Sequence, residues 1–390
     1  TKYIPISSES MPNHIKSARD AILSYISETK NTSIVNGKMI FLQGSPKLSK
    51  KNGMLMGRLS GIVAHHIPYY LLKNRLPSFK TNCIDDWNEK MDAIVEETMF
   101  EKMTLISGIP PWVQMYFEKL QKKTGKLIKD LFPNFDLFIY GGVNYEPYRN
   151  SFEKLIGKKI DGVELYPASE GFIAYQDSQK EKGMLLCVNH GIFYEFIVAE
   201  DFFAKNPSRI PLSEVEIGVN YVIILNTNAG LWGYNIGDTV KFVSTNPYKI
   251  IVSGRIKHFT SAFGEHVIGE EVESALKEVL EKIPAQVNEF HVAPQVNPKK
   301  GLPYHEWFVE FEKKPEKIGD FKSLIDICLQ KQNSYYKDLI VGGVLSPLEV
   351  TVLRKNTFRK YMSSIGKLGG QNKVPRLANN RDIADKLNNF

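Results

Sequence analysis

Hydrophobic patterns along the first part of the chain predict helices followed by strands, and the later segments are rich in strands. Strand-like hydrophobic runs lie at residues 38–42, 137–140, 162–166, 184–188, 221–225 and 239–242. A helix is predicted from Asp85 and Asp86 to about Met103, and Pro110 with Pro111 marks the first turn of another helix. Helices among the early strands and strand-rich later segments predict an α/β domain that continues into a more antiparallel part.

After Arg255 the pattern starts again and predicts a separate, smaller domain. Its predicted elements are a helix at 270–282, strands at 289–292 and 306–311, a helix at 321–330 and a strand at 348–353. This set is typical of a small α+β domain, and a length of 390 residues suits two domains. We therefore predict a large domain over residues 1–254, a small mobile domain over residues 255–390, and a hinge at about 253–257.

Composition describes an ordinary globular protein and argues against several classes of partner. Hydrophobic residues make up 43% of the chain and charged residues 24%. The sequence has no run of about 18 apolar residues, so it does not predict a membrane span. The net charge of +7 comes with lysine clusters that lack interleaved aromatic residues, so a nucleic-acid surface is not expected. Cys83, Cys187 and Cys328 are far apart and odd in number, which is typical of reduced thiols and predicts a cytoplasmic location.

Two motifs in the large domain contain residue types that suit a nucleotide. The run from Tyr166 to Gly171 places the hydroxyl of Ser169 beside the carboxylate of Glu170 on a predicted tight turn. These groups suit a phosphate oxygen and its Mg²⁺. Further along, Asp238 lies on a second predicted turn, where one carboxylate can accept from both ribose hydroxyls. A capped turn or a loop glycine would explain either motif alone, so their order along the chain carries the argument.

Further motifs extend that order and carry a resemblance to a known family. They are Lys2 to Pro5, Tyr140 to Val143, Ala229 to Asp238, Ser253 to Arg255 and Gln371 to Arg376. In this order the sequence resembles the adenylate-forming enzymes, and within them the auxin-responsive Gretchen Hagen family of acyl-acid amido synthetases, in its bacterial form. The resemblance runs from the first residue to about Arg376 and implies an adenylate-forming fold for the large domain.

The resemblance implies a site for ATP and Mg²⁺ in the large domain. Adenine would lie against the turn of Gly141, Gly142 and Val143, with Tyr166 beside the nucleotide. Ser169 would donate to the α-phosphate, Glu170 would hold Mg²⁺ and Asp238 would accept from the ribose hydroxyls. A plain glycine turn is the alternative reading of Gly141 and Gly142.

The resemblance also implies two cationic residues for the reaction. Lys373 would bridge the acyl carboxylate and the α-phosphate during adenylation, and a mobile loop would deliver it. Arg255 would reach the ribose or the phosphates, with an interdomain salt bridge as the alternative. Gln371 and Arg376 belong to the motif of Lys373 and have no role assigned from the sequence.

The activity implied by the resemblance is the joining of a carboxylic acid to an amino acid with consumption of ATP. The acid would form an acyl adenylate with release of pyrophosphate, and the amine would then attack that adenylate. A thiol in place of the amine would make the protein an acyl-thioester (CoA) ligase, and a non-catalytic nucleotide-binding protein is a further alternative. The sequence predicts no oligomeric state.

The family's Ser/Thr/Gly-rich phosphate loop lies directly before the segment that occupies residues 2–5 here. We therefore expect the large domain to be N-terminally incomplete in this sequence, and ATP turnover to require that loop.

The sequence also offers candidates for the wall of the acyl pocket and gives no support to two hydrolase classes. The candidates for the pocket wall suit a hydrophobic core equally well: Met54, Leu55, Ile109, Trp112, Val113 and Met115. His65 with His66, and His258 with His266, lack metal-ligand spacing, and the sequence has no Gly-x-Ser-x-Gly motif. Metal-dependent and serine hydrolases are therefore not supported.

Overall fold

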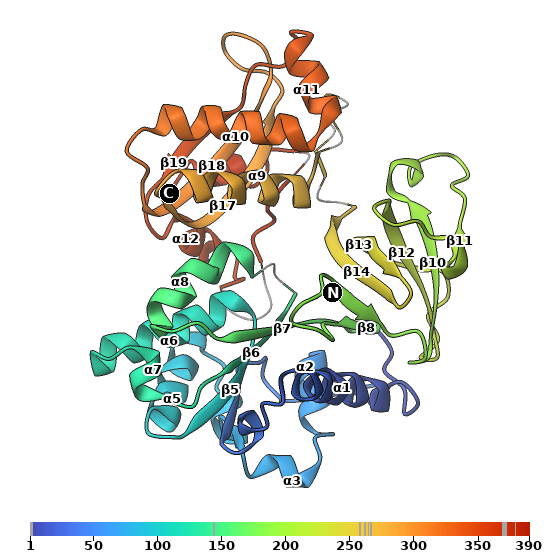
Figure 1. Cartoon of the computed structure of the whole chain (residues 1–390), viewed down its shortest axis with the longest axis vertical. Coiled ribbons are helices and arrows are strands. Elements are labelled where there is room, and N and C mark those ends of the chain that lie inside the picture. Colours follow the sequence, from blue (N-terminus) through green and yellow to red (C-terminus); the bar gives the residue numbers. More distant parts are fainter. Residues whose placement is uncertain are drawn as a thin grey trace. The chain divides into compact units, whose positions relative to one another are not determined.

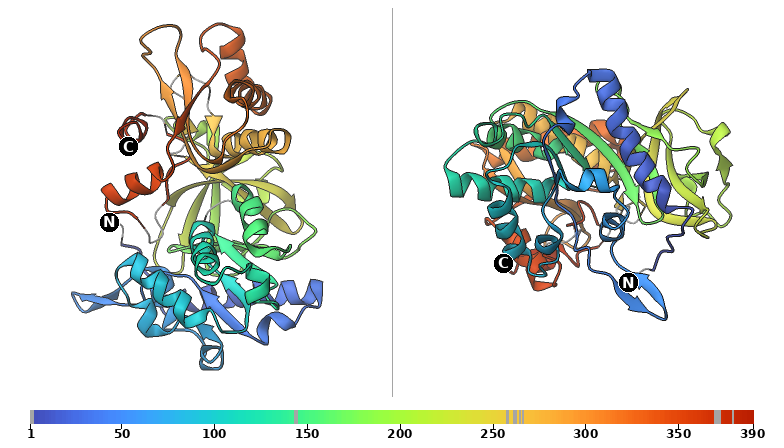
Figure 2. Two further views of the ribbon diagram at one scale, coloured as in Figure 1. Left: turned by 90° about the vertical axis from the view of Figure 1, so that its left-hand side faces the viewer. Right: turned by 90° about the horizontal axis from the view of Figure 1, so that it is seen from below.

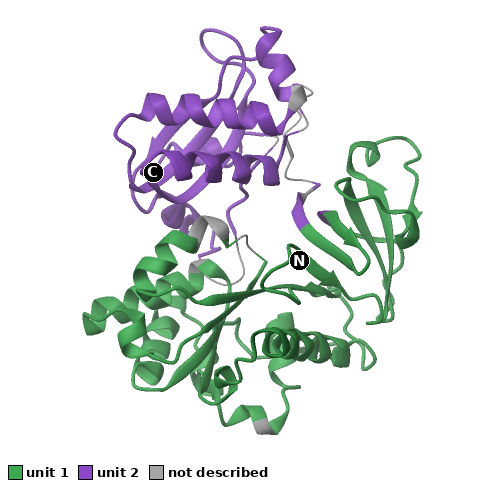
Figure 3. Cartoon of the chain, viewed as in Figure 1, with its two compact units in different colours: residues 1–236, 241–251, 369–371 green, residues 237–240, 252–368, 372–390 purple. Residues whose placement is uncertain are grey.

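The computed structural model describes residues 3–142, 145–256, 259–260, 263, 265, 267–368, 373–378 and 380–390. These residues form two compact units (Figure 3). The first unit is built from residues within 1–236 and 241–251, and the second from residues within 237–240, 252–368 and 372–390. The units part inside strand β14 (Tyr248–Arg255), between Ile251 and Val252.

One sheet, with 12 strands among the described residues, is the framework of the first unit (Figure 1). Its parallel strands, in spatial order, are β4 (Arg75–Leu76), β1 (Lys38–Phe41), β5 (Met103–Ser107), β6 (Leu137–Gly141) and β7 (Asp161–Ala168). Antiparallel pairing begins at β8 (Gly171–Tyr175) and continues through β9 (Met184–Leu186) to β14. The order then runs through β13 (Tyr234–Thr245), β12 (Asn220–Thr227), β10 (Ile192–Val198) and β11 (Ile210–Pro211). The prediction of an α/β domain that becomes antiparallel is confirmed.

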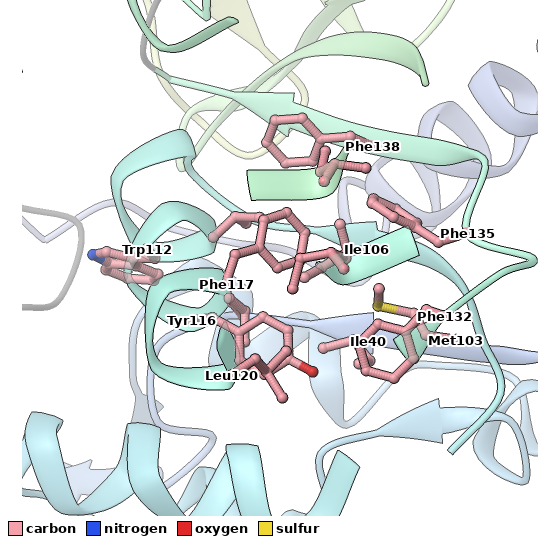
Figure 4. Close-up of a cluster of buried hydrophobic side chains, with 14 of the residues drawn as sticks. Ile40, Met103, Ile106, Trp112, Tyr116, Phe117, Leu120, Phe132, Phe135 and Phe138 are labelled. Carbon is pink, nitrogen blue, oxygen red and sulfur yellow. The ribbon is translucent and has the colours of Figure 1, made fainter. Parts of the chain in front are cut away.

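Helices cover both faces of the parallel strands, because successive strand residues point to opposite sides of a sheet. Phe138 of β6 packs in a cluster with side chains of α5 (Trp87–Thr98), α6 (Pro110–Thr124), α7 (Ile128–Leu131) and α8 (Glu146–Ile156). Its neighbours Leu137 and Ile139 pack in a second cluster with α1 (Met11–Thr29), which lies against β7 and β8 (Figure 1). Figure 4 shows Tyr116, Phe117 and other side chains of the first cluster between α6 and the strands.

The ends of the predicted helices are partly confirmed. Asp86 caps α5, since its carboxylate accepts from the main-chain nitrogen of Glu89 at 2.8 Å. The predicted end of this helix near Met103 is wrong, because the helix ends at Thr98 and Met103 begins strand β5. Hydrophobic side chains continue from one element into the next, so their spacing hid the boundary. The next helix, α6, begins at Pro110 as predicted.

Lys90 of α5 is 3% exposed and ties the segment at Gln43 and the short helix that ends at Asn82 to the first unit's core. Its ammonium donates to the main-chain oxygens of Asn82 at 2.8 Å and Gln43 at 3.1 Å. Burial lowers the pKa of Lys90 from 10.5 to about 8, because the charged form loses solvation.

Shorter elements complete the first unit. They are the hairpin of β2 (Ser49–Lys51) and β3 (Met54–Met56), with α2 (Leu59–Ala64), α3 (Tyr69–Leu72) and α4 (Phe79–Asn82). The β2–β3 hairpin projects from the rest of this unit (Figure 2).

The second unit is a small α+β structure, as predicted. Its main sheet consists of β17 (Gln286–Gln295), β18 (Tyr304–Lys313) and β19 (Glu349–Leu353). Helices α9 (Gly269–Lys282) and α10 (Ile318–Gln332) lie side by side on one face (Figure 1). The helices α12 (Thr357–Ser364) and α13 (Ala384–Leu387) pack with residues of the opposite face. A short pair, β15 (Phe259–Thr260) with β16 (Val267–Ile268), and helix α11 (Ser334–Val341) complete the unit.

Every helix in the described parts of the chain falls short of the length or the apolar character that crossing a bilayer requires.

Candidate functional site

Strands β6 and β7 bring two of the predicted motifs to one edge of the sheet. The strands are parallel, so their carboxyl ends lie at the same edge. The register pairs Gly141 with Leu165, and Tyr166 comes one residue after this pair. Ser169 lies four residues beyond Leu165, or roughly 13 Å further along an extended strand. The glycine motif and the Ser-Glu motif therefore lie on neighbouring strands, as a site for one elongated ligand requires.

Gly141 approaches β7 more closely than a residue with a side chain could. A Cβ atom at this position would lie 2.3 Å from the main-chain oxygen of Leu165 and 3.5 Å from Cδ of Pro167. Gly142 follows with φ of 72°, in the left-handed region that favours glycine. The backbone itself therefore requires both glycines, and they leave the main chain at this edge without side chains.

Ser169 and Glu170 form the two-residue turn between β7 and β8, because Ala168 pairs with Gly171 across the hairpin. The predicted tight turn is confirmed, and both side chains are half-buried. Gly171 is held closely, since a Cβ there would lie 2.6 Å from Cδ1 of Ile192. The strands thus fix the turn, while Ser169 and Glu170 stay partly exposed.

Tyr166 occupies a buried position in β7, with 7% of its surface exposed. The pairing of β7 with β8 shifts register between Tyr166 and Pro167. A proline has no N–H for the ladder, so a bulge is a suitable place for it. The bulge lies between the Gly141 contact and the Ser-Glu turn.

Asp238 lies inside strand β13, so the prediction of a turn at this point is wrong. Gly237 has φ of 87°, yet its oxygen accepts from the main-chain nitrogen of Ile256 at 2.8 Å, and the pairing continues through this kink. Asp238 is 8% exposed. The next residue, Thr239, is also buried and its hydroxyl accepts from that of Ser253 at 2.9 Å. This hydroxyl pair beside Asp238 was not predicted, because its two members lie on different strands.

Lys373 is an exposed residue of the second unit. The segment that follows it is bound to strand β17, and Arg376 of the same motif contacts Glu289 and Glu273. Arg255 is the last residue of β14. The side chain of Arg255 lies outside the described part of the structure, as do Val143, Gln371, Asn372 and Lys257.

The candidates for the acyl pocket divide into core and surface residues. Trp112 and Val113 are buried in the cluster of Figure 4, and Ile109 and Met115 pack against that cluster. Met54 and Leu55 are instead 66% and 67% exposed on the β2–β3 hairpin. The six candidates therefore do not line a common pocket wall within the first unit.

The donor groups fit Mg²⁺ better than a metal that needs a closed protein cage. Within the described ranges, no group of three or more His, Cys, Asp or Glu side chains could hold a metal ion. Mg²⁺ is commonly bound by one or two carboxylates together with substrate phosphates and water. A single carboxylate at the Glu170 turn is compatible with that coordination.

Two consecutive parts of the chain match known domain families. Residues 185–255 match the GH3 family central domain, and residues 270–382 match the GH3 family C-terminal domain.

Curated relatives of the chain include plant amido synthetases. The indole-3-acetic acid-amido synthetase GH3.10 of Arabidopsis thaliana is 28% identical over 208 residues, which cover 48% of this chain and 33% of that protein. The jasmonoyl-L-amino acid synthetase JAR4 of Nicotiana attenuata is 26% identical over 311 residues, which cover 74% of this chain and 49% of that protein. The matches thus span half or less of the length of these relatives.

Solved structures show the same fold. The GH3.15 acyl acid amido synthetase matches with a TM-score of 0.77 and 16% identity over 100% of this chain and 79% of that chain. A 2-hydroxyisobutyryl-CoA ligase matches with a TM-score of 0.56 and 14% identity, over 92% of this chain and 71% of that chain. The predicted fold class, an adenylate-forming α/β domain with a small α+β domain, is confirmed. Both domain models match in sequence and the fold agrees, so residues 185–255 and 270–382 form central and C-terminal domains of the GH3 family, which is the Gretchen Hagen family that the motifs of the chain resemble.

Proposed function

We propose that this chain is part of an ATP-dependent acyl-acid amido synthetase, which joins a carboxylic acid to the amine of an amino acid. The observation that supports this most strongly is the match of residues 185–255 and 270–382 to consecutive GH3 family domains. Relatives in that family are named as an indole-3-acetic acid-amido synthetase and a jasmonoyl-L-amino acid synthetase. We therefore take a carboxylic acid and an L-amino acid as the substrate classes.

In the first step, an oxygen of the acid's carboxylate attacks the α-phosphorus of ATP, and pyrophosphate leaves. Ser169 donates to an α-phosphate oxygen from the tip of the β7–β8 turn, and the carboxylate of Asp238 accepts from the ribose hydroxyls. Arg255 adds a contact to the ribose or the phosphates. Contacts to adenine and its surroundings are assigned to Gly141, Gly142, Val143 and Tyr166.

Glu170 is the proposed carboxylate ligand of Mg²⁺. When bound, Mg²⁺ would neutralise charge on the departing pyrophosphate.

Lys373 is the proposed catalytic lysine, and its ammonium bridges the acyl carboxylate and the α-phosphate during adenylation. The small domain, predicted to begin at residue 255, withdraws it by rotating before the second step. The amine of the amino acid then attacks the acyl carbon, and AMP leaves as the amide forms. Closure around the acyl adenylate would exclude water from this hydrolysis-prone anhydride.

The role of Lys373 predicts that Lys373→Ala lowers acid-dependent exchange of pyrophosphate into ATP by about a hundredfold or more, by analogy with the loss of one transition-state donor. Lys367→Ala is a suitable control, because Lys367 is an exposed lysine shortly before the same motif. Exchange at the wild-type rate in Lys373→Ala would refute the assignment.

The cellular location is part of the proposal. All three cysteines are free thiols, and Cys187 and Cys328 are buried. Free thiols agree with a cytoplasmic location, which stays a prediction.

An acyl-thioester ligase is the second candidate function, because a CoA ligase shares the fold. The two candidates differ only in the group that attacks the acyl adenylate. A non-catalytic nucleotide-binding protein is a third possibility that predicts ATP binding without AMP release.

Product analysis separates these candidates. The complete gene product is incubated with MgATP, a mixture of carboxylic acids, and either amino acids or coenzyme A, and products are identified by mass spectrometry. An amide with AMP supports the amido synthetase and identifies both substrates. A thioester would replace it by the ligase, and nucleotide binding without AMP would favour the binding protein.

A further inference from the structure

The main chain just after Lys373 is bound to the edge of the small sheet. The main-chain oxygen of Arg376 accepts from the main-chain nitrogen of Val292 at 2.8 Å. The main-chain oxygen of Val292 accepts in turn from the main-chain nitrogen of Ala378 at 2.9 Å. Leu377 forms a parallel bridge with Val292 and is fully buried. Residues 376–378 therefore extend the sheet beside β17, and Lys373 lies just before this anchored segment.

The guanidinium of Arg376 adds a second set of contacts to the anchored segment. It forms an ion pair with Glu289 of β17, and its Nε lies 3.9 Å from a carboxylate oxygen of Glu273 of α9. It also lies over the ring of Phe290, with 4.7 Å to the ring centroid. The Arg376 side chain is 15% exposed and each glutamate 20%, so these pairs are shielded from solvent more than surface pairs are.

His291 holds the peptide group between Lys373 and Arg376. Its side chain is fully buried, and its Nδ1 lies 2.7 Å from the main-chain oxygen of Pro375. A carbonyl oxygen can only accept, so Nδ1 carries the proton and donates.

The link from this anchor to Lys373 is short and stiff. Pro375 has a restricted φ, and Val374, which precedes it, is restricted to extended conformations. Three extended residues and a lysine side chain place the ammonium of Lys373 up to about 16 Å from the anchor. A rotation of about 10° at the anchor would move it by nearly 3 Å, whereas a misplacement of about 1 Å can cost a hundredfold in rate.

We propose that Arg376 and His291 are positioning residues that aim the ammonium of Lys373 during adenylation. This inference rests on the function proposed above. Neither residue touches substrate, and both act by fixing the main chain from which Lys373 projects. Their loss therefore slows only the half-reaction in which Lys373 takes part.

The first test is Arg376→Met in the complete protein. We expect the kcat of acid-dependent pyrophosphate exchange to fall by roughly thirtyfold or more, with the KM values for ATP and acid within about threefold of wild type. Amide formation from acyl adenylate supplied in solution should keep its wild-type rate, because this step does not use Lys373. Arg376→Lys should recover part of the exchange rate. An equal loss in both half-reactions, or no loss in exchange, would overturn the proposal.

Arg381→Met is the matched control. Arg381 also pairs with two carboxylates, Glu306 at 2.9 Å and Asp385 at 3.0 Å, and lies over the ring of Phe308 at 5.9 Å. It is 20% exposed and belongs to the same unit, but it anchors a later segment. We expect Arg381→Met to lose stability without slowing exchange.

A double-mutant comparison separates positioning from a general structural effect. If Arg376 acts through Lys373, Arg376→Met should cost no further exchange activity in the Lys373→Ala background. An additive loss would contradict the proposal. His291→Leu should behave in the same way, and Glu289→Gln replaces Arg376→Met if circular dichroism shows that the latter is unfolded.

The outcomes also distinguish this inference from the proposed function. Wild-type exchange in Lys373→Ala would remove the proposed catalytic lysine itself. A slow Lys373→Ala with normal Arg376→Met and His291→Leu would overturn the positioning role alone.

Discussion

Gly141→Ala tests whether the close approach of β6 to β7 is needed for the proposed nucleotide site. The new Cβ would lie 2.3 Å from the oxygen of Leu165, whereas ordinary contact begins at 3.4 Å, so the strands would have to part by 1.1 Å (3.4 minus 2.3). Ladder hydrogen bonds have N···O distances of about 2.9 Å, and such a shift would break those beside Gly141. Overpacking costs about 1–3 kcal/mol and each lost hydrogen bond about 1 kcal/mol, so we expect a loss of about 3 kcal/mol or more in unfolding free energy.

Gly125→Ala is the matched control in the same unit. Gly125 ends α6 with φ of 70°, and a Cβ there would meet nothing within 4 Å. Only the cost of the left-handed conformation applies, which is about 1–2 kcal/mol. This position is not part of the proposed nucleotide site, so ATP affinity should not change.

The assay has two parts, urea unfolding followed by circular dichroism and calorimetric titration of the complete protein with ATP. We expect Gly141→Ala to be less stable than Gly125→Ala and to bind ATP at least about tenfold more weakly, because the displaced strand carries Tyr166 and the Ser-Glu turn. Equal stability losses in the two variants with unchanged ATP affinity would refute the reasoning from the close contact.

Two buried charged residues give further predictions. Asp238→Ala should weaken ATP binding by roughly tenfold to a hundredfold, since a hydrogen bond to a charged group contributes about 1.5–3 kcal/mol, but should not change the affinity for 2′,3′-dideoxy-ATP. Calorimetry with both nucleotides checks this, and an equal loss for both would contradict a ribose contact. The pKa of Lys90 is about 8 in the folded protein and 10.5 when the side chain is exposed in the unfolded chain. Between these two pH values the unfolded chain binds one more proton than the folded protein. The free energy of unfolding should therefore rise with pH, by up to about 3 kcal/mol in total. This rise should be absent in Lys90→Met. If urea unfolding gives the same change in unfolding free energy from about pH 8 to 10.5 for the wild type and for Lys90→Met, the lowered pKa of Lys90 is excluded.

Local patterns predicted many elements because a buried strand or an amphipathic helix shows its environment in its own residues. The run 137–140 is hydrophobic on both faces, and the structure buries both faces of β6. Hydrophobic spacing did not predict the boundary where two hydrophobic elements adjoin, as at the end of α5. It also failed at Asp238, because Gly237 indicates a turn while its pairing partner, Ile256, keeps the segment in a strand.

Within the candidate site, the order of the motifs along the chain led to the family and to the residue types that suit a nucleotide. The Ser-Glu turn was also predictable, since a hairpin turn depends on a few adjacent residues. The contacts around Arg376 were not, because His291 and Pro375 are 84 positions apart in sequence.

By itself, the sequence determined the two-part organisation, the change from parallel to antiparallel strands and the residue types that suit a nucleotide, because hydrophobic spacing and motif composition are properties of residues near one another in the chain. Only the tertiary structure decided that Gly141 has no room for a Cβ and that Arg376 and His291 anchor the segment behind Lys373. These facts depend on strand register and on packing between distant segments, which no local pattern specifies.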